Sequence, residues 1–243
     1  MKLSKVYKYA AFLLLFIVLS CYDDGIEEEP PVNEINILTI GDSRVQGNRP
    51  YHESYRYELW KSLIESDWTV DFLGPNTDQA EYPEFLGLEF DKNHAAVGGY
   101  TTKNVLTTIE ATLADIEVPD VILMGIGGID LIRDNSYDQA IANMHVIIDI
   151  LQENNPDVTI FMEQIAPAIS DIYTDENILI FEGFNDAILT VSEERTTEDS
   201  KVVAVDMAEG WQDLFLADDL HYNAIGAKIV ADRYFDAIEE HVE

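Results

Sequence analysis

Basic residues are scarce in this sequence. Only 14 lysines and arginines stand against 47 aspartates and glutamates in 243 residues, which gives a formal net charge of -33 at pH 7. A surface of that sign repels the phosphates of nucleic acids and the anionic headgroups of lipids. The charge therefore argues against a nucleic-acid-binding protein, although acidity alone identifies no substrate.

Cysteine and long apolar runs are scarce as well. The single cysteine, Cys21, has no partner for an internal disulfide, and a Cys/His zinc site is excluded. The apolar run at residues 10–19 holds about ten residues, too few to span a bilayer. With 47% hydrophobic residues the chain is nevertheless rich enough to build one domain with a sizeable core.

The first 20 residues have the pattern of a leader. Three lysines precede the apolar run, and a small residue, Ser20, stands directly before Cys21. This arrangement resembles a bacterial lipoprotein signal, which implies cleavage before Cys21 and a lipid anchor on its sulfur that attaches the protein to a membrane. The alternative is an ordinary secretory signal with an incidental cysteine. We therefore expect a signal peptide at residues 1–20.

Residues 21–34 are expected to form a tether. They contain five acidic residues between Tyr22 and Pro30, two adjacent prolines and little to bury, so self-repulsion should keep them extended. An acidic run after a lipidated cysteine resembles surface-export signals of bacterial lipoproteins, while a plain spacer is the alternative. The expected location is the cell envelope of a bacterium, periplasmic or on the outer surface, and the folded domain is expected at residues 35–243.

Along the rest of the chain, apolar runs of strand length alternate with segments whose apolar residues have helical spacing. This order predicts an α/β fold with a parallel sheet covered by helices on both faces. The predicted strands lie at residues 35–40, 70–74, 121–124, 158–162 and 202–205. The predicted helices lie at residues 55–66, from 101 or 102 to about 116, 137–153, 178–194, and from a cap at Asn223 to about 238.

A serine follows the first predicted strand directly. Gly41-Asp42-Ser43 ends the apolar run, and open α/β sheets place their chemistry at the carboxyl ends of strands. A serine hydroxyl needs a base to take its proton and a third group to orient that base. Ser43 is therefore a candidate nucleophile.

Five histidines are available as the base, and four have other plausible places. His52 follows the serine in a loop and could line a pocket, and His94 could be a pocket or a core residue. His145 lies on a predicted helix, and His241 in the tail. His221 stands in a short loop with Asp218 three residues earlier, a spacing that lets the carboxylate reach one imidazole nitrogen while the other faces Ser43.

Ester hydrolysis also requires donors for the oxyanion. The backbone N–H groups of Ser43 and Gly99 are candidates, because glycine lets a backbone approach a substrate closely. A simple tight turn at Gly98-Gly99 is the alternative. In this scheme no metal or cofactor is needed.

Together these segments resemble the SGNH (GDSL-type) hydrolases. Residues 41–47 match the first block with Ser43 as nucleophile, Gly99 matches the glycine of the second, residues 127–130 align with the third, and residues 218–221 match the Asp-x-x-His block. The resemblance implies a flavodoxin-like three-layer α/β/α fold and ester hydrolysis through an acyl-enzyme.

Further residues resemble one branch of this family, the family 3 carbohydrate esterases. They are Ser54-Tyr55-Arg56-Tyr57, Trp60 and residues 70–74. This resemblance implies acetylated oligo- or polysaccharide as the substrate; it sets no oligomeric state.

One position departs from the family pattern. The third-block asparagine, whose amide helps to hold the oxyanion, is Ile129 here. Loss of one such donor costs about 10²–10³ in rate. Either a backbone N–H of Gly127 or Gly128 replaces it, or the enzyme is slow, or the protein binds glycans without cleaving them. A lipase- or thioesterase-type member of the family is the other alternative.

Overall fold

The computed structural model describes residues 33–134, 136–169 and 178–242. The predicted signal peptide, the lipidation site Cys21 and nearly all of the tether lie outside these residues. Within the described parts of the chain, no helix is long and apolar enough to cross a membrane.

The described residues form seven strands and six α-helices, together with two short helical turns. The strands are β1 (Glu34–Gly41), β2 (Thr69–Leu73), β3 (Asn76–Thr77), β4 (Asn93–His94), β5 (Val121–Gly125), β6 (Thr159–Gln164) and β7 (Val202–Asp206). The helices are α1 (Ser43–Gln46), α2 (Arg56–Glu65), α3 (Thr102–Ala114), α4 (Tyr137–Asn154), α5 (Ile178–Arg195) and α6 (Ala224–His241), with the π-helical turn η1 (Asp130–Asp134) and the 3₁₀ turn η2 (Asp213–Phe215). All five predicted strands and all five predicted helices are present.

The main sheet is parallel throughout, with the strand order β2-β1-β5-β6-β7. The chain runs outward from β1 to β2 and then crosses back to β5 on the other side of β1, so the order reverses between β1 and β5. Ligand sites of open α/β sheets lie at the carboxyl ends of strands at such a reversal. Gly41 and Gly125 are paired there, and Ser43 follows Gly41 by two residues.

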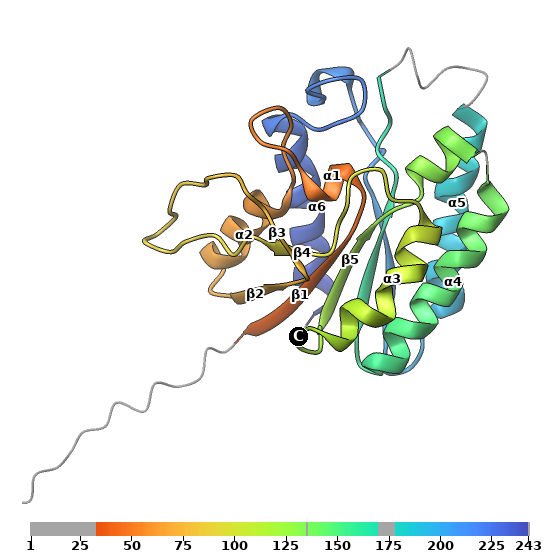
Figure 1. The fold of residues 1–243 in the computed structure, drawn as a ribbon, viewed down its shortest axis with the longest axis horizontal. Helices are drawn as coiled ribbons and strands as arrows, with labels where there is room; N and C mark the ends of the chain where they lie inside the picture. Colours follow the sequence, from red (N-terminus) through yellow and green to blue (C-terminus); the bar gives the residue numbers. More distant parts are fainter. Residues whose placement is uncertain (1–32, 135, 170–177, 243) are drawn as a thin grey trace, which may run out of the picture. The chain divides into compact units, whose positions relative to one another are not determined.

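Helices cover both faces of this sheet, as predicted, with α2 and α6 on one face and α3, α4 and α5 on the other (Figure 1). The alternation of side chains along β1 explains the two cores. Ile35 and Ile37 pack toward α2 and α6, whereas Leu38 and Ile40 pack toward the opposite helices. The three-layer α/β/α fold implied by the family resemblance is therefore confirmed.

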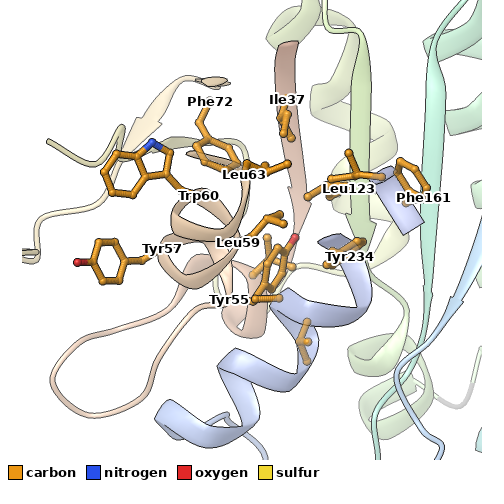
Figure 2. Packing of buried hydrophobic residues seen from close by; sticks show 14 of the residues in the cluster. Ile37, Tyr55, Tyr57, Leu59, Trp60, Leu63, Phe72, Leu123, Phe161 and Tyr234 are labelled. Carbon is orange, nitrogen blue, oxygen red and sulfur yellow. The ribbon is translucent and has the colours of Figure 1, made fainter. Parts of the chain in front are cut away.

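The core under α2 and α6 is rich in aromatic side chains. Figure 2 shows Trp60 and Phe72 close together beside α2, and Tyr55 close to Tyr234, which reaches in from α6. Tyr55 and Tyr234 are fully buried, and their ring centroids lie 4.8 Å apart. This core holds the start of α2 and the body of α6 rigidly beside the end of β1.

Candidate active site

Ser43 lies in a sharp turn between β1 and α1. The side chain of Asp42 caps α1, because its Oδ1 accepts a hydrogen bond from the N–H of Arg44 at 2.9 Å. Gly41 is required at the end of β1, since a Cβ at this position would lie 2.5 Å from the carbonyl oxygen of Gly125 and closer still to Val45. The turn therefore fixes Ser43 at the carboxyl edge of the sheet.

The structure brings the three predicted catalytic residues together. His221 Nε2 lies 2.8 Å from Ser43 Oγ, and His221 Nδ1 lies 2.8 Å from Asp218 Oδ2. The loop between η2 and α6 supplies both partners, and Asp218 Oδ1 accepts the N–H groups of Leu220 and His221 at 2.8 and 2.7 Å. The backbone of the loop thus holds the carboxylate of Asp218 in place beside the imidazole of His221.

The charge of Asp218 determines the direction of these hydrogen bonds. Partial burial raises the pKa of Asp218, but the N–H groups of His221 and Leu220 and the imidazole of His221 outweigh that effect and lower it to about 2. An ionised carboxylate only accepts hydrogen bonds, so Nδ1 of His221 carries the proton. Nε2 is then free to accept from the hydroxyl of Ser43.

A second histidine supports the first. The ring of His52 stacks on that of His221 with centroids 4.0 Å apart and planes 18° from parallel. Burial and the neighbouring His221 lower the pKa of His52 to about 4, so His52 is neutral at neutral pH. The sequence placed His52 only in a loop near a pocket; its contact with His221 joins residues far apart in the chain.

Arg44 ties the nucleophile turn to the loop of His221. Its guanidinium is buried and donates hydrogen bonds to the carbonyl oxygens of Leu220 at 2.8 Å and Ala166 at 2.6 Å. Its carbon Cζ also lies 5.0 Å from the ring centroid of Tyr222. The sequence analysis did not predict this role. The only local sign of it in the sequence is the arginine directly after Ser43.

The turn at Gly98-Gly99 lies against the serine. A Cβ on Gly98 would come within 3.7 Å of Ser43 Cβ, and the N–H of Gly98 donates to Gln46 Oε1 at 2.7 Å. Gly99 has φ +79°, which favours glycine. Among the described residues, neither the N–H of Ser43 nor that of Gly99 has a hydrogen-bond acceptor. Both groups are thus available to an incoming oxygen.

The third block lies beside this turn, and its aspartate is hydrogen-bonded to the start of α3. Asp130 accepts hydrogen bonds from the N–H and the hydroxyl of Thr102 at 2.9 and 2.6 Å. Ile129 is buried and lines a cavity of about 30 Å³, which also touches Asp42 and Leu220, the residues that precede Ser43 and His221. Apolar side chains form most of its wall, namely Ile126, Ile129, Ile132, Ile165, Ala166, Ala168 and Phe181.

The remaining histidines lie elsewhere. His94 is buried in β4, His145 lies half-buried on α4, and His241 ends α6. In the described part of the chain no three histidine, cysteine, aspartate or glutamate side chains are grouped so that they could hold a metal ion.

Several solved structures resemble this fold. A carbohydrate esterase family 3 protein from Talaromyces cellulolyticus superposes with a TM-score of 0.73 at 21% identity, covering 85% of this chain and 97% of that one. A Clostridium thermocellum family 3 carbohydrate esterase gives 0.68 at 24% identity, with 86% and 96% covered. An acetyl xylan esterase gives 0.63 at 17% identity, with 84% and 100% covered. At these identities the likeness establishes the fold.

No curated protein matches the sequence. The sequence itself matches a family of hydrolases over residues 39–229, which include the serine turn, the glycine turn and the Asp-x-x-His loop. Since this match spans most of the chain, the protein belongs to the GDSL-like lipase/acylhydrolase family.

Proposed function

We propose that this protein is a serine esterase that removes short acyl groups, above all acetyl, from carbohydrate. The observation that carries the proposal is the aligned chain of hydrogen bonds from Ser43 Oγ through His221 to Asp218, with heavy-atom distances of 2.8 Å at both steps. This geometry suits proton removal from a nucleophilic hydroxyl.

The proposed reaction has two stages. As Ser43 Oγ attacks the ester carbonyl, its proton passes to His221 Nε2, and Asp218 stabilises the imidazolium through Nδ1–H. His221 then protonates the departing sugar oxygen, leaving the acyl group on Ser43. A water molecule, deprotonated by His221, attacks this acyl-enzyme and releases the carboxylic acid. His221 passes the proton that it took from this water to Ser43 Oγ as the acyl–oxygen bond breaks, which restores the free enzyme.

The proposed oxyanion site uses the N–H groups of Ser43 and Gly99. Both lack an acceptor within the described residues, and the glycine turn lies against the serine. The side chain of Ile129 cannot donate a hydrogen bond, so these backbone groups stabilise the negative charge of the oxyanion without a side-chain amide. Backbone donors are already oriented before the substrate binds, which is the requirement for such stabilisation.

Two observations support a short acyl group on carbohydrate. The cavity beside Asp42 and Leu220 is lined mostly by apolar side chains and is small, about 30 Å³, far below the roughly 300–1,000 Å³ of drug-sized ligand sites. A long acyl chain does not fit there, which argues against a lipase- or thioesterase-type substrate. The similar structures include proteins described as carbohydrate esterases and as an acetyl xylan esterase.

Replacement of the nucleophile tests the proposal. Ser43→Ala should lower acetate release from acetylated polysaccharides and from an aryl acetate by a factor of about 10³ or more, because the other groups have nothing to activate. Ser62→Ala, which changes a serine on α2 away from the site, is the matched control and should retain full activity. Equal turnover by Ser43→Ala would overturn the assignment. Binding of acetylated oligosaccharide by the native protein without acetate release would instead favour a glycan-binding protein.

A further inference from the structure

A second hollow lies at the end of α1, the short helix that Ser43 begins, and its character differs from that of the small cavity. It is a groove of about 570 Å³ between the end of α1 and the ribbon formed by β3 and β4. We propose that this groove binds the sugar that carries the ester, and that it selects neutral, hydroxyl-rich oligosaccharides. The inference rests on the proposed esterase function.

Two residues of the groove connect it with the turn that holds Ser43. Gln46, the last residue of the four-residue helix that Ser43 begins, lines the groove and accepts the N–H of Gly98. Val97 lines it as well and directly precedes the glycine turn. A sugar bound here would therefore extend from the serine along the β3–β4 ribbon.

The charged groups along the groove are already neutralised within the protein. Asp78 Oδ2 accepts from the guanidinium of Arg56 at 3.3 Å and from the hydroxyl of Tyr82 at 2.6 Å. Arg49 pairs with Glu53 at 3.1 Å. Its guanidinium also lies 4.8 Å from the centroid of the Tyr82 ring. No unpaired cation of the described residues lines the groove, so nothing there compensates an anionic ligand in a protein of net charge -33.

Uncharged amides remain open toward a ligand. The side chain of Asn48 makes no hydrogen bond to any described residue, and those of Gln46, Asn76 and Gln79 each use only one of their two polar atoms. An amide both donates and accepts, as does a sugar hydroxyl, so the two are well matched. The volume of the groove lies within the range of small-molecule sites.

The different lining of the two hollows predicts how the ester is oriented in the site. The apolar cavity of about 30 Å³ accommodates a small acyl group, and the amide-lined groove accommodates the alcohol. The scissile bond is then placed at Ser43, since Asp42, which precedes it, lines the cavity and Gln46, at the other end of α1, lines the groove. Selectivity for the acyl group and for the sugar thus depends on different residues.

Asn48 provides the sharpest test, because its free side chain is not needed for folding. With acetylated xylo-oligosaccharides, Asn48→Ala should raise KM by about two- to tenfold, the loss expected for one or two hydrogen bonds, and Asn48→Trp should raise it further by filling the groove. Neither variant should change kcat/KM for an aryl acetate, which has no sugar. Asp157→Ala is the matched control, since Asp157 lines a groove of about 580 Å³ remote from Ser43.

Direct binding keeps this test independent of catalysis. By calorimetry, unacetylated xylo-oligosaccharide should bind the native protein more tightly than Asn48→Trp and more tightly than an acidic oligogalacturonide. Equal KM and equal binding in the native protein and Asn48→Trp would overturn the groove assignment while leaving aryl acetate hydrolysis, and hence the esterase, intact. Preference for the acidic oligosaccharide would overturn the selectivity. Loss of aryl acetate hydrolysis in the native protein would instead contradict the esterase function.

Discussion

At the scale of single residues, the stack of His52 on His221 gives the imidazole proposed as the base a fixed plane. The hydrogen bond to Asp218 restrains one nitrogen of the ring but still permits rotation about that bond. The ring of His52, 4.0 Å away, blocks this rotation. Because burial holds the pKa of His52 near 4, no positive charge opposes the imidazolium that forms on His221 at neutral pH.

Substitutions at His52 should separate ring shape from charge. His52→Ala removes a stacked pair worth about 0.5–1.5 kcal/mol, so we expect kcat to fall by roughly two- to tenfold with little change in KM. His52→Phe keeps a flat ring and should restore most of kcat. Steady-state kinetics on an aryl acetate provide the measurement.

The pH profile supplies a control for this role. His52 is deprotonated above about pH 5, so His52→Phe should leave the dependence of kcat/KM on pH unchanged above that value. A shifted acid limb in this variant would show that His52 exchanges protons during turnover. Full activity in His52→Ala would show that the stack does not position His221.

The contrast between Asp218 and His52 shows which residues of the site the sequence could predict. Asp218 and His221 lie three residues apart and are hydrogen-bonded within one turn, so their spacing in the sequence is enough to predict their contact. His52 reaches His221, and Arg44 reaches Leu220, only through the fold. No local pattern encodes such contacts, and one sequence alone could not reveal them.

At the scale of elements, Asp130 joins the end of β5 to the start of α3. Its carboxylate accepts two hydrogen bonds from Thr102, and the hydroxyl of Thr102 accepts a third from Asn143 of α4 at 2.9 Å. All three side chains are buried. Since Gly99 lies three residues before Thr102, this network holds the glycine turn against Ser43.

Removal of this link should damage both stability and catalysis. Asp130→Ala leaves the buried N–H of Thr102 without an acceptor, so we expect a loss of about 1–3 kcal/mol in the free energy of unfolding. Displacement of Gly99 should also lower kcat. Asp130→Asn keeps an acceptor and should lose less of both. Chemical denaturation measures the stability and aryl acetate kinetics measure kcat. If Asp130→Ala is destabilised but keeps the native kcat, the network does not position the turn at Gly99.

Long elements were predictable and very short ones were not. Of the two threonines expected at the start of α3, Thr101 is the cap, and the predicted cap Asn223 starts α6. Each accepts a backbone N–H, because a side-chain oxygen at such a position is a local signal. The β3–β4 ribbon has two residues per strand, and η1 is a single π-helical turn. Periodicity needs more residues than these contain, so neither was predicted.

At the scale of the whole molecule, the excess of negative charge acts against the compact state. Folding brings most of the 47 acidic residues onto one limited surface, where only 11 basic residues compensate them, since three of the 14 lie in the predicted signal peptide. The resulting repulsion acts over long distances at low salt, with a screening length of about 30 Å at 0.01 M and about 10 Å at 0.1 M.

Added salt should therefore stabilise this protein at neutral pH. We expect Tm at pH 7.5 to rise steadily with sodium chloride, with each kcal/mol gained worth about 2–4 °C in a domain of this size. Chloride is preferable to sulfate, which stabilises proteins generally. Near pH 4.1, the isoelectric point expected from the composition of the chain, the net charge is small and the same salt series should leave Tm almost unchanged. A Tm at pH 7.5 that does not depend on salt would show that the acidic side chains lie far enough apart for the folded surface to tolerate its charge.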